Sequence, residues 1–200
     1  MQVTMLGGYG DLADMLLSAD PAALSFRRRE FQNIDAWRAA ARAKVAELLA
    51  CPDTGTPEVE VVGQAIVDGL VATRLRWQLA YGPPTEALFL KPQGAQGSLP
   101  GVLALHDHGG LKYYGWRKIA DDGTPVHPVV QGLREESYGA RAWANALARH
   151  GYAVLCHDVF LWGSRRIRLS DVPERVRWEG AKDPRADTEQ EVRVYNEWAG

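Results

Sequence analysis

The sequence has few cysteines, little net charge and no long apolar run. Only two of its 200 residues are cysteine, Cys51 and Cys156, which is too few for a disulfide framework and fits a reducing compartment. The formal net charge is −2, so electrostatics gives no reason to expect a nucleic-acid partner. No apolar stretch approaches the roughly 20 residues that a membrane helix needs. We therefore expect a cytoplasmic protein with no membrane or nucleic-acid partner.

The rest of the composition is that of an ordinary globular protein. Hydrophobic residues make up 46% of the chain and charged residues 24%, which provides enough apolar material for one good core. The sequence contains no internal repeat and no low-complexity segment. We expect an N-terminal helical extension over residues 1–57, followed by an α/β domain over residues 58–200.

Two helices can be predicted near the ends of the chain. The first spans residues 33–50, where Asn33 or Asp35 can cap the start. Its apolar side chains recur at spacings of three and four: Ile34, Trp37, Ala41, Val45 and Leu48. The last helix is expected to begin at Asp187, with Gln190 as its capping-box partner.

Residues 58–90 predict three strands that lead into the domain. The first begins as an alternating E-V-E-V-V at residues 58–62, and from Leu70 onward apolar residues alternate with arginine and glutamine. A third strand resumes at residues 87–90 after a Gly-Pro-Pro break. Alternation with one polar face is typical of antiparallel strands that are solvated on one side.

A short apolar run at residues 102–105 is the centre of the predicted domain. Pro100 and Gly101 precede it, and H-D-H-G-G follows it at residues 106–110. A run of this kind predicts a strand buried on both faces, as in a parallel sheet covered by helices. The carboxyl ends of such strands are where open α/β sheets bind their ligands.

A second buried strand, at residues 152–156, ends in His157 and Asp158. Between the two buried strands, Ser137 can cap a helix that runs to His150 and is followed by a glycine. The strand, the helix and the second strand form a βαβ unit. Asp158 can lie at the edge of a site or anchor the turn that follows it, and the sequence favours the anchor.

Two long loops bring candidate binding residues to this edge of the sheet. Residues 111–136 carry aromatic side chains, among them Tyr113, that can line a pocket or pack the loop onto the body. The loop after the second buried strand carries Trp162 and Arg165. Arg165 can bind a substrate carboxylate through a bidentate fork or pair internally with Asp158.

The H-D-H-G-G turn has two chemical interpretations. Gly109 and Gly110 let the backbone approach a ligand and expose N–H groups that can stabilise an oxyanion. His106 and His108 lie two residues apart and can begin a metal site, but no third ligand lies at a recognised spacing. The sequence favours the oxyanion hole, with Gly109 and Gly110 as backbone donors and no metal.

These segments resemble the α/β-hydrolase fold, in particular its dienelactone-hydrolase-like and acetyl-xylan-esterase-like branch. L-P-G-V-L-A-L-H-D-H-G-G at residues 99–110 is similar to the oxyanion strand and loop of that fold. G-Y-A-V-L-C-H-D-V-F-L-W-G-S-R-R at residues 151–166 is similar to its next strand, with a D-x(4)-G-x-R pattern at the end. The resemblance implies a mostly parallel sheet flanked by helices, with antiparallel leading strands and N-terminal helices. It also implies hydrolysis of carboxylic esters, including carbohydrate esters or lactones, through an acyl-enzyme.

One feature of that family is missing from residues 1–200. The family's nucleophile lies in a G-x-S-x-G elbow between a strand and a helix. None of the serines has both flanking glycines: Ser18, Ser25, Ser98, Ser137, Ser164 and Ser170. We therefore expect the N-terminal half of a hydrolase domain, truncated before the nucleophile strand, with the triad beyond Gly200 and no turnover by this half alone.

The expected ligand of the whole protein is a small-molecule ester, and no cofactor is expected. An unpaired sheet edge would favour a homo-oligomer or aggregation. Two alternatives stay open: a non-catalytic α/β binding or interaction module derived from a hydrolase, and a metal hydrolase that uses His106 and His108. The residues expected to contact substrate all follow the two buried strands: His108, Tyr113, Trp162 and Arg165.

Overall fold

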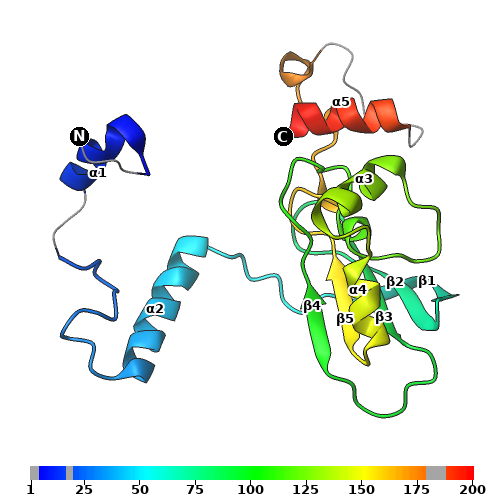
Figure 1. Ribbon diagram of the computed structural model, residues 1–200, viewed down its shortest axis with the longest axis horizontal. Coiled ribbons are helices and arrows are strands. Elements are labelled where there is room, and N and C mark those ends of the chain that lie inside the picture. The colour runs from blue at the N-terminus through cyan, green and yellow to red at the C-terminus, as the bar shows by residue number, and fades with distance from the viewer. Residues whose placement is uncertain (1–4, 17–19, 179–187) are drawn as a thin grey trace. The chain divides into compact units, whose positions relative to one another are not determined.

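The computed structural model describes residues 5–16, 20–178 and 188–200 (Figure 1). By its internal contacts the chain divides into two units, Met1–Asp53 and Thr54–Gly200. The described residues include no helix that is long and apolar enough to cross a membrane.

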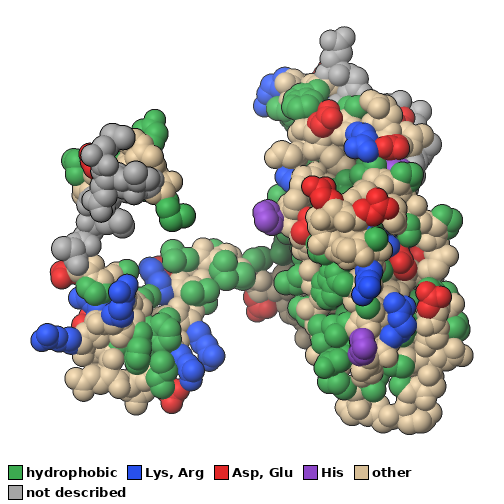
Figure 2. Space-filling model, in the orientation of Figure 1, with side chains coloured by type: hydrophobic (Ala, Val, Ile, Leu, Met, Phe, Trp, Pro, Cys, Tyr) green, Lys and Arg blue, Asp and Glu red, His purple; other side chains and the backbone are tan. Residues whose placement is uncertain are grey.

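In the described part of the N-terminal unit there are two α-helices, α1 (Gly10–Leu16) and α2 (Ile34–Leu49), and a 3₁₀ turn, η1 (Gly7–Tyr9), precedes α1. The prediction of a helix at residues 33–50 is confirmed, and Asn33 caps it by accepting hydrogen bonds from two backbone N–H groups. Trp37 packs its ring 5.3 Å from that of Phe26, measured between centroids. Other apolar side chains of α2 stay exposed, so Figure 2 shows hydrophobic and basic side chains side by side on this unit.

The second unit is built on a five-stranded sheet in the order β1-β2-β3-β5-β4. Its strands are β1 (Val59–Val67), β2 (Leu70–Trp77), β3 (Thr85–Pro92), β4 (Gly101–Ala104) and β5 (Ala153–His157). Three neighbouring pairs are antiparallel and only β4 and β5 are parallel. The expectation of a mostly parallel sheet is therefore wrong for these strands, because the antiparallel leading strands make up most of the sheet. The predicted α/β class is confirmed.

One face of the sheet carries the core. Helix α4 (Trp143–Arg149) lies across β3 and β5 on this face, as Figure 1 shows. The buried strand side chains of this core are Leu70, Ala72, Leu88, Leu90, Ala104, Val154 and Cys156. On the opposite face of β4 and just beyond its end, Leu103 and Leu105 are 59% and 56% exposed. Burial of apolar area therefore stabilises β4 through its core face, and the opposite face contributes little.

The connection from β4 to β5 contains a 3₁₀ turn, η2 (Trp116–Lys118), and two α-helices. Helix α3 (Pro128–Ser137) begins with proline in its first turn, and the side chain of His127 caps it. The prediction of one helix from Ser137 to His150 is wrong in its first half, because Gly139 and Ala140 have positive φ angles, which a right-handed helix does not accommodate. Helix α4 begins only at Trp143.

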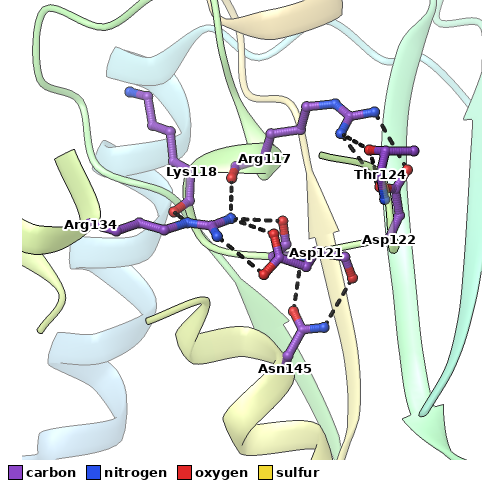
Figure 3. A network of polar contacts seen from close by, with 8 residues as sticks. Arg117, Lys118, Asp121, Asp122, Thr124, Arg134 and Asn145 are labelled. Atoms are coloured by element: carbon purple, nitrogen blue, oxygen red, sulfur yellow. Dashed lines mark hydrogen bonds and ion pairs between the residues drawn. The ribbon is translucent and has the colours of Figure 1, made fainter. Parts of the chain in front are cut away.

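A network around Arg134 holds the irregular part of this connection together (Figure 3). The Arg134 guanidinium is buried and donates hydrogen bonds to the carbonyl oxygens of residues 117, 118 and 120. It also pairs with the Asp121 carboxylate at 2.9 Å. Asn145 accepts from the Asp121 N–H and donates to the Asp121 carbonyl. The segment is therefore ordered without regular structure, because its backbone polar groups have partners.

The last helix, α5 (Glu189–Ala199), packs by Val192 and Tyr195, which are fully buried. Its N-cap is Thr188, whose side chain accepts from the Glu191 N–H. The predicted cap, Asp187, lies outside the described residues. Figure 1 shows α3 and α5 beyond the ends of the strands.

Candidate functional site

The loops that follow β4 and β5 leave the sheet at the same edge, because these two strands are adjacent and parallel. The first loop contains residues 106–110 and the second runs from Asp158 to the short 3₁₀ turn η3 (Gly163–Arg165). This is the edge at which the sequence predicts a site.

His106 joins the two loops. Its side chain is 7% exposed, with Nδ1 2.8 Å from the Asp107 carbonyl oxygen. Nε2 accepts a long hydrogen bond of 3.4 Å from the Val159 N–H, so the bonding pattern assigns the proton to Nδ1. Burial lowers the pKa of His106, which keeps the ring neutral at pH 7. His106 therefore connects the loop after β4 to the loop after β5.

Asp107 organises the first loop from its side chain. Its carboxylate accepts hydrogen bonds from the Gly109 N–H at 2.8 Å and from the Tyr138 hydroxyl at 3.0 Å. The ammonium group of Lys118, a side chain with no solvent exposure, lies 3.4 Å away. Burial alone would raise the pKa of Asp107, but the Lys118 charge and these hydrogen bonds hold it below its ordinary value. Asp107 is thus a carboxylate at neutral pH.

The two predicted oxyanion donors differ in the structure. The Gly109 N–H is already bound to Asp107, so it is not a free donor. Gly110 is exposed, and within the described residues its N–H has no hydrogen-bond acceptor. His108 is exposed beside them. The oxyanion hole predicted from the sequence needs free N–H groups on both Gly109 and Gly110. Within the described residues, only the Gly110 N–H is free.

Trp162 lies against this loop and Arg165 does not. The Trp162 indole N–H donates to the Gly109 carbonyl at 3.4 Å, and its ring is 6.1 Å from that of His106. Arg165 is buried; its Nη1 donates to the Thr85 hydroxyl at 2.9 Å, and the guanidinium lies over the ring of Tyr81. Of the two, only Trp162 is near the predicted donors.

Asp158 locks the second loop. Its buried carboxylate accepts hydrogen bonds from the Trp116 N–H at 2.8 Å and the Ser164 N–H at 2.7 Å. A Cβ atom on Gly115 or Gly163 would overlap this carboxylate, so only glycine fits at either position. Burial raises the pKa of Asp158 to about 6. The anchoring interpretation of Asp158 is confirmed.

The hydroxyl and the N–H of Ser164 are both hydrogen-bonded within the protein. Its hydroxyl oxygen accepts a hydrogen bond from the Glu86 N–H at 2.9 Å, while its own N–H is bound to Asp158. The first contact ties η3 to the start of β3, and the second ties it to the residue that follows β5. These contacts agree with the absence of a nucleophile elbow around this serine.

Lys118, Tyr138 and Arg134 shape the site, and sequence reasoning missed all three. Lys118 follows Arg117 in a short basic pair with no periodic signal that marks it as buried, and Tyr138 lies in a segment that was predicted to be helical. Only the structure shows that both reach Asp107 from the connection between β4 and β5. No local signal in the sequence distinguishes the buried Lys118 from the more exposed Arg117 beside it.

A cavity of about 370 Å³ lies next to this scaffold. Tyr113, Trp116 and Asp158 line it, together with four arginines, whereas Gly109 and Gly110 do not. The predicted binding residues are therefore split between two places: Tyr113 faces the cavity, and Trp162 lies on the glycine loop. Within the described ranges, no cluster of three or more His, Cys, Asp or Glu side chains is placed to hold a metal ion.

Neither a protein-family model nor a curated protein matches the sequence. Among solved structures, the chain is similar to a proposed acetyl xylan esterase from Bacteroides fragilis NCTC 9343, with a TM-score of 0.55 and 17% sequence identity. The match covers 83% of this chain and 42% of that protein, so the chain spans less than half of its length. At this identity the likeness concerns the fold alone, and it supports the α/β architecture that the sequence predicts.

Proposed function

We propose that residues 1–200 belong to a carboxylic-ester hydrolase that works through an acyl-enzyme, and that the loop after β4 supplies an oxyanion donor. The observation that carries the proposal is the exposed Gly110 N–H at the carboxyl end of a strand, without an acceptor in the described part of the chain. A fixed backbone N–H directed at developing negative charge is the main requirement of an oxyanion hole.

The way in which the loop is held supports this role. Asp107 binds the Gly109 N–H, and Tyr138 and Lys118 in turn hold Asp107. A donor contributes most to catalysis when its position is fixed before the reaction begins, because no reorganisation is then needed. Gly109 is therefore assigned to the support of the loop and Gly110 to donation.

The nucleophile is assigned to residues outside 1–200. No G-x-S-x-G is present in this sequence, and the similar esterase is more than twice as long as the segment that matches. β4 is an end strand of the described sheet, paired with β5 alone. Its free edge is where a further parallel strand would bring a nucleophile elbow beside Gly110.

The ester itself is proposed only as a class. Trp162 lies against the loop and His108 is exposed beside it, and these side chains can contact an acyl or alcohol group. A carbohydrate ester or a lactone, as the resemblance implies, is compatible with an aromatic wall of this kind.

Replacement of Gly110 tests the proposal in the intact protein that carries residues 1–200. Gly110→Pro removes the N–H, whereas Gly110→Ala keeps it and adds a methyl group that meets no atom within 4 Å. With p-nitrophenyl acetate, we expect kcat/KM to fall on the order of 10² to 10³ for Gly110→Pro and to change little for Gly110→Ala. Equal activity of the two variants, with equal unfolding transitions, would contradict the donor role.

Residues 1–200 alone provide the second test. We expect no ester turnover above the buffer rate, because the nucleophile is assigned elsewhere. Turnover that a serine-directed phosphonofluoridate abolishes would contradict that assignment.

A further inference from the structure

The cavity beside Asp158 is strongly cationic for its size. Four arginines line it, Arg76, Arg117, Arg166 and Arg168, against two acidic residues, Glu86 and Asp158. Its volume of about 370 Å³ lies at the small end of the range for organic ligands. All of these residues belong to the second unit.

Two of the arginines already have acidic partners. Arg76 pairs with Glu60 at 2.8 Å, and Arg117 pairs with Asp122 at 3.4 Å. Arg166 and Arg168 have no acidic partner within the described residues. The positive charge that an anion could neutralise is therefore concentrated on Arg166 and its near neighbour in sequence.

Arg166 is oriented by its surroundings. Its guanidinium carbon lies 4.5 Å from the ring centre of Tyr113 and 5.9 Å from that of Tyr195. Nη1 donates to the Gly163 carbonyl at 2.9 Å, and Nε is buried without an acceptor. The edge formed by Nε and Nη2 is the one that remains, and it matches the spacing of two oxygens of a carboxylate or phosphate.

The two carboxylates of the cavity do not occupy this edge. Asp158 is bound to the Trp116 and Ser164 N–H groups, as described above. Glu86 is exposed and lies opposite Arg76 in the sheet register. Neither forms an ion pair with Arg166.

We infer that this cavity binds a small organic anion, with the carboxylate or phosphate group on Arg166 and additional charge from Arg168. Tyr113 keeps the guanidinium plane in place, so that the two N–H groups along the Nε–Nη2 edge point in fixed directions. The inference concerns binding alone and does not depend on the proposed hydrolysis.

Three sugars that differ in charge test the inference: D-glucuronate, D-glucose 6-phosphate and D-glucose, each titrated calorimetrically into the full chain at low salt. We expect saturable binding of at least one of the two anions with one site per chain, and no measurable binding of glucose. The preferred anion distinguishes a carboxylate from a phosphate ligand. Added salt should weaken the binding because an exposed part of the attraction is screened.

Arginine variants then locate the site. Arg166→Lys keeps the charge but loses the planar edge, and we expect binding to weaken about tenfold or more. Arg168→Gln, at an exposed position, should cause a smaller loss without affecting the unfolding transition. Arg149→Gln is the matched control, since this exposed arginine lies on α4 and does not line the cavity.

Binding of glucose as tight as that of the anions would overturn the inference, as would no binding of any probe. Equal losses in Arg168→Gln and Arg149→Gln would show unspecific attraction and would also overturn it. Loss of ester hydrolysis in the Gly110→Pro variant with unchanged anion binding would separate this site from the proposed catalytic loop.

Discussion

The neighbouring parallel strands β4 and β5 are each followed by a loop that contains an aspartate, and the two loops differ in how firmly they are held. After β5, Asp158 is buried, its carboxylate is bound to two backbone amides, and two glycines leave no space around it. After β4, Asp107 binds one amide of its own loop, and Gly110 stays exposed. The loop after β5 is therefore held in place by Asp158. The loop after β4 is held at Gly109, while the N–H of Gly110 stays available to a ligand.

The pKa values of the two aspartates shift in opposite directions. Burial raises the pKa of Asp158 to about 6, since its hydrogen bonds only partly replace water. Asp107 is also partly buried, but Lys118 and the hydrogen bonds keep its pKa below the ordinary value. The scaffold aspartate therefore costs stability when it is charged, whereas the aspartate of the donor loop is stabilised in its charged form.

The largest expected effect comes from filling the space around Asp158. Gly115→Ala places a methyl group on the carboxylate, and Asp158 cannot move without losing its bonds to Trp116 and Ser164. We expect the free energy of unfolding in urea to fall by more than about 3 kcal/mol. Gly110→Ala is the control in the other loop, and it should change stability by less than about 0.5 kcal/mol. Similar losses in both variants would remove the distinction between the loops.

A pH dependence of intermediate size should arise from Asp158. Because its pKa in the folded state, about 6, exceeds the unfolded value of 3.8, the folded state binds the proton more tightly. This group's contribution to stability is therefore full below about pH 4 and is lost as the pH rises through 6, by on the order of 3 kcal/mol.

The variant Asp158→Asn isolates this contribution, since asparagine does not titrate. Urea unfolding from pH 4 to pH 7 should show the stability advantage of the unmodified protein over the variant decreasing with pH. An advantage that is constant or grows across this range would mean that Asp158 does not have the raised pKa.

A smaller effect is expected from Tyr138→Phe, which removes the hydroxyl that donates to Asp107 at 3.0 Å. The loss of one hydrogen bond to a charged acceptor should lower the free energy of unfolding by about 1 to 2 kcal/mol. Amide exchange at Gly109 should become faster, because its acceptor is less well held. Exchange at Trp116 should be unchanged, and a parallel change there would indicate a general loss of structure.

The sequence predicted the strands well because their signals are local. Alternation of apolar and polar residues predicted β1 and β2, a short apolar run predicted β5 to within one residue at each end, and the Asn33 cap marked the start of α2. The glycine loop after β4 was also found, since H-D-H-G-G follows a short apolar run. These predictions depend only on residues that are adjacent in the chain.

The errors concern a contact between distant residues and local backbone conformations that the sequence pattern does not specify. Nothing near Arg165 indicates that its partner is Thr85, 80 positions away, and this contact removes Arg165 from the predicted binding wall. The occupied N–H of Gly109 depends on how Asp107 turns back on its own loop. The break between α3 and α4 follows from the positive φ of two residues, one of which is alanine and gives no local signal.

Amide hydrogen exchange, resolved residue by residue by NMR, tests the contrast between the loops most directly. The structure predicts strong protection of the Trp116 and Ser164 amides, weaker protection at Gly109, and exchange close to the unprotected rate at Gly110. A Gly110 amide protected as strongly as that of Gly109, or Trp116 and Ser164 amides that exchange as fast as Gly110, would contradict it.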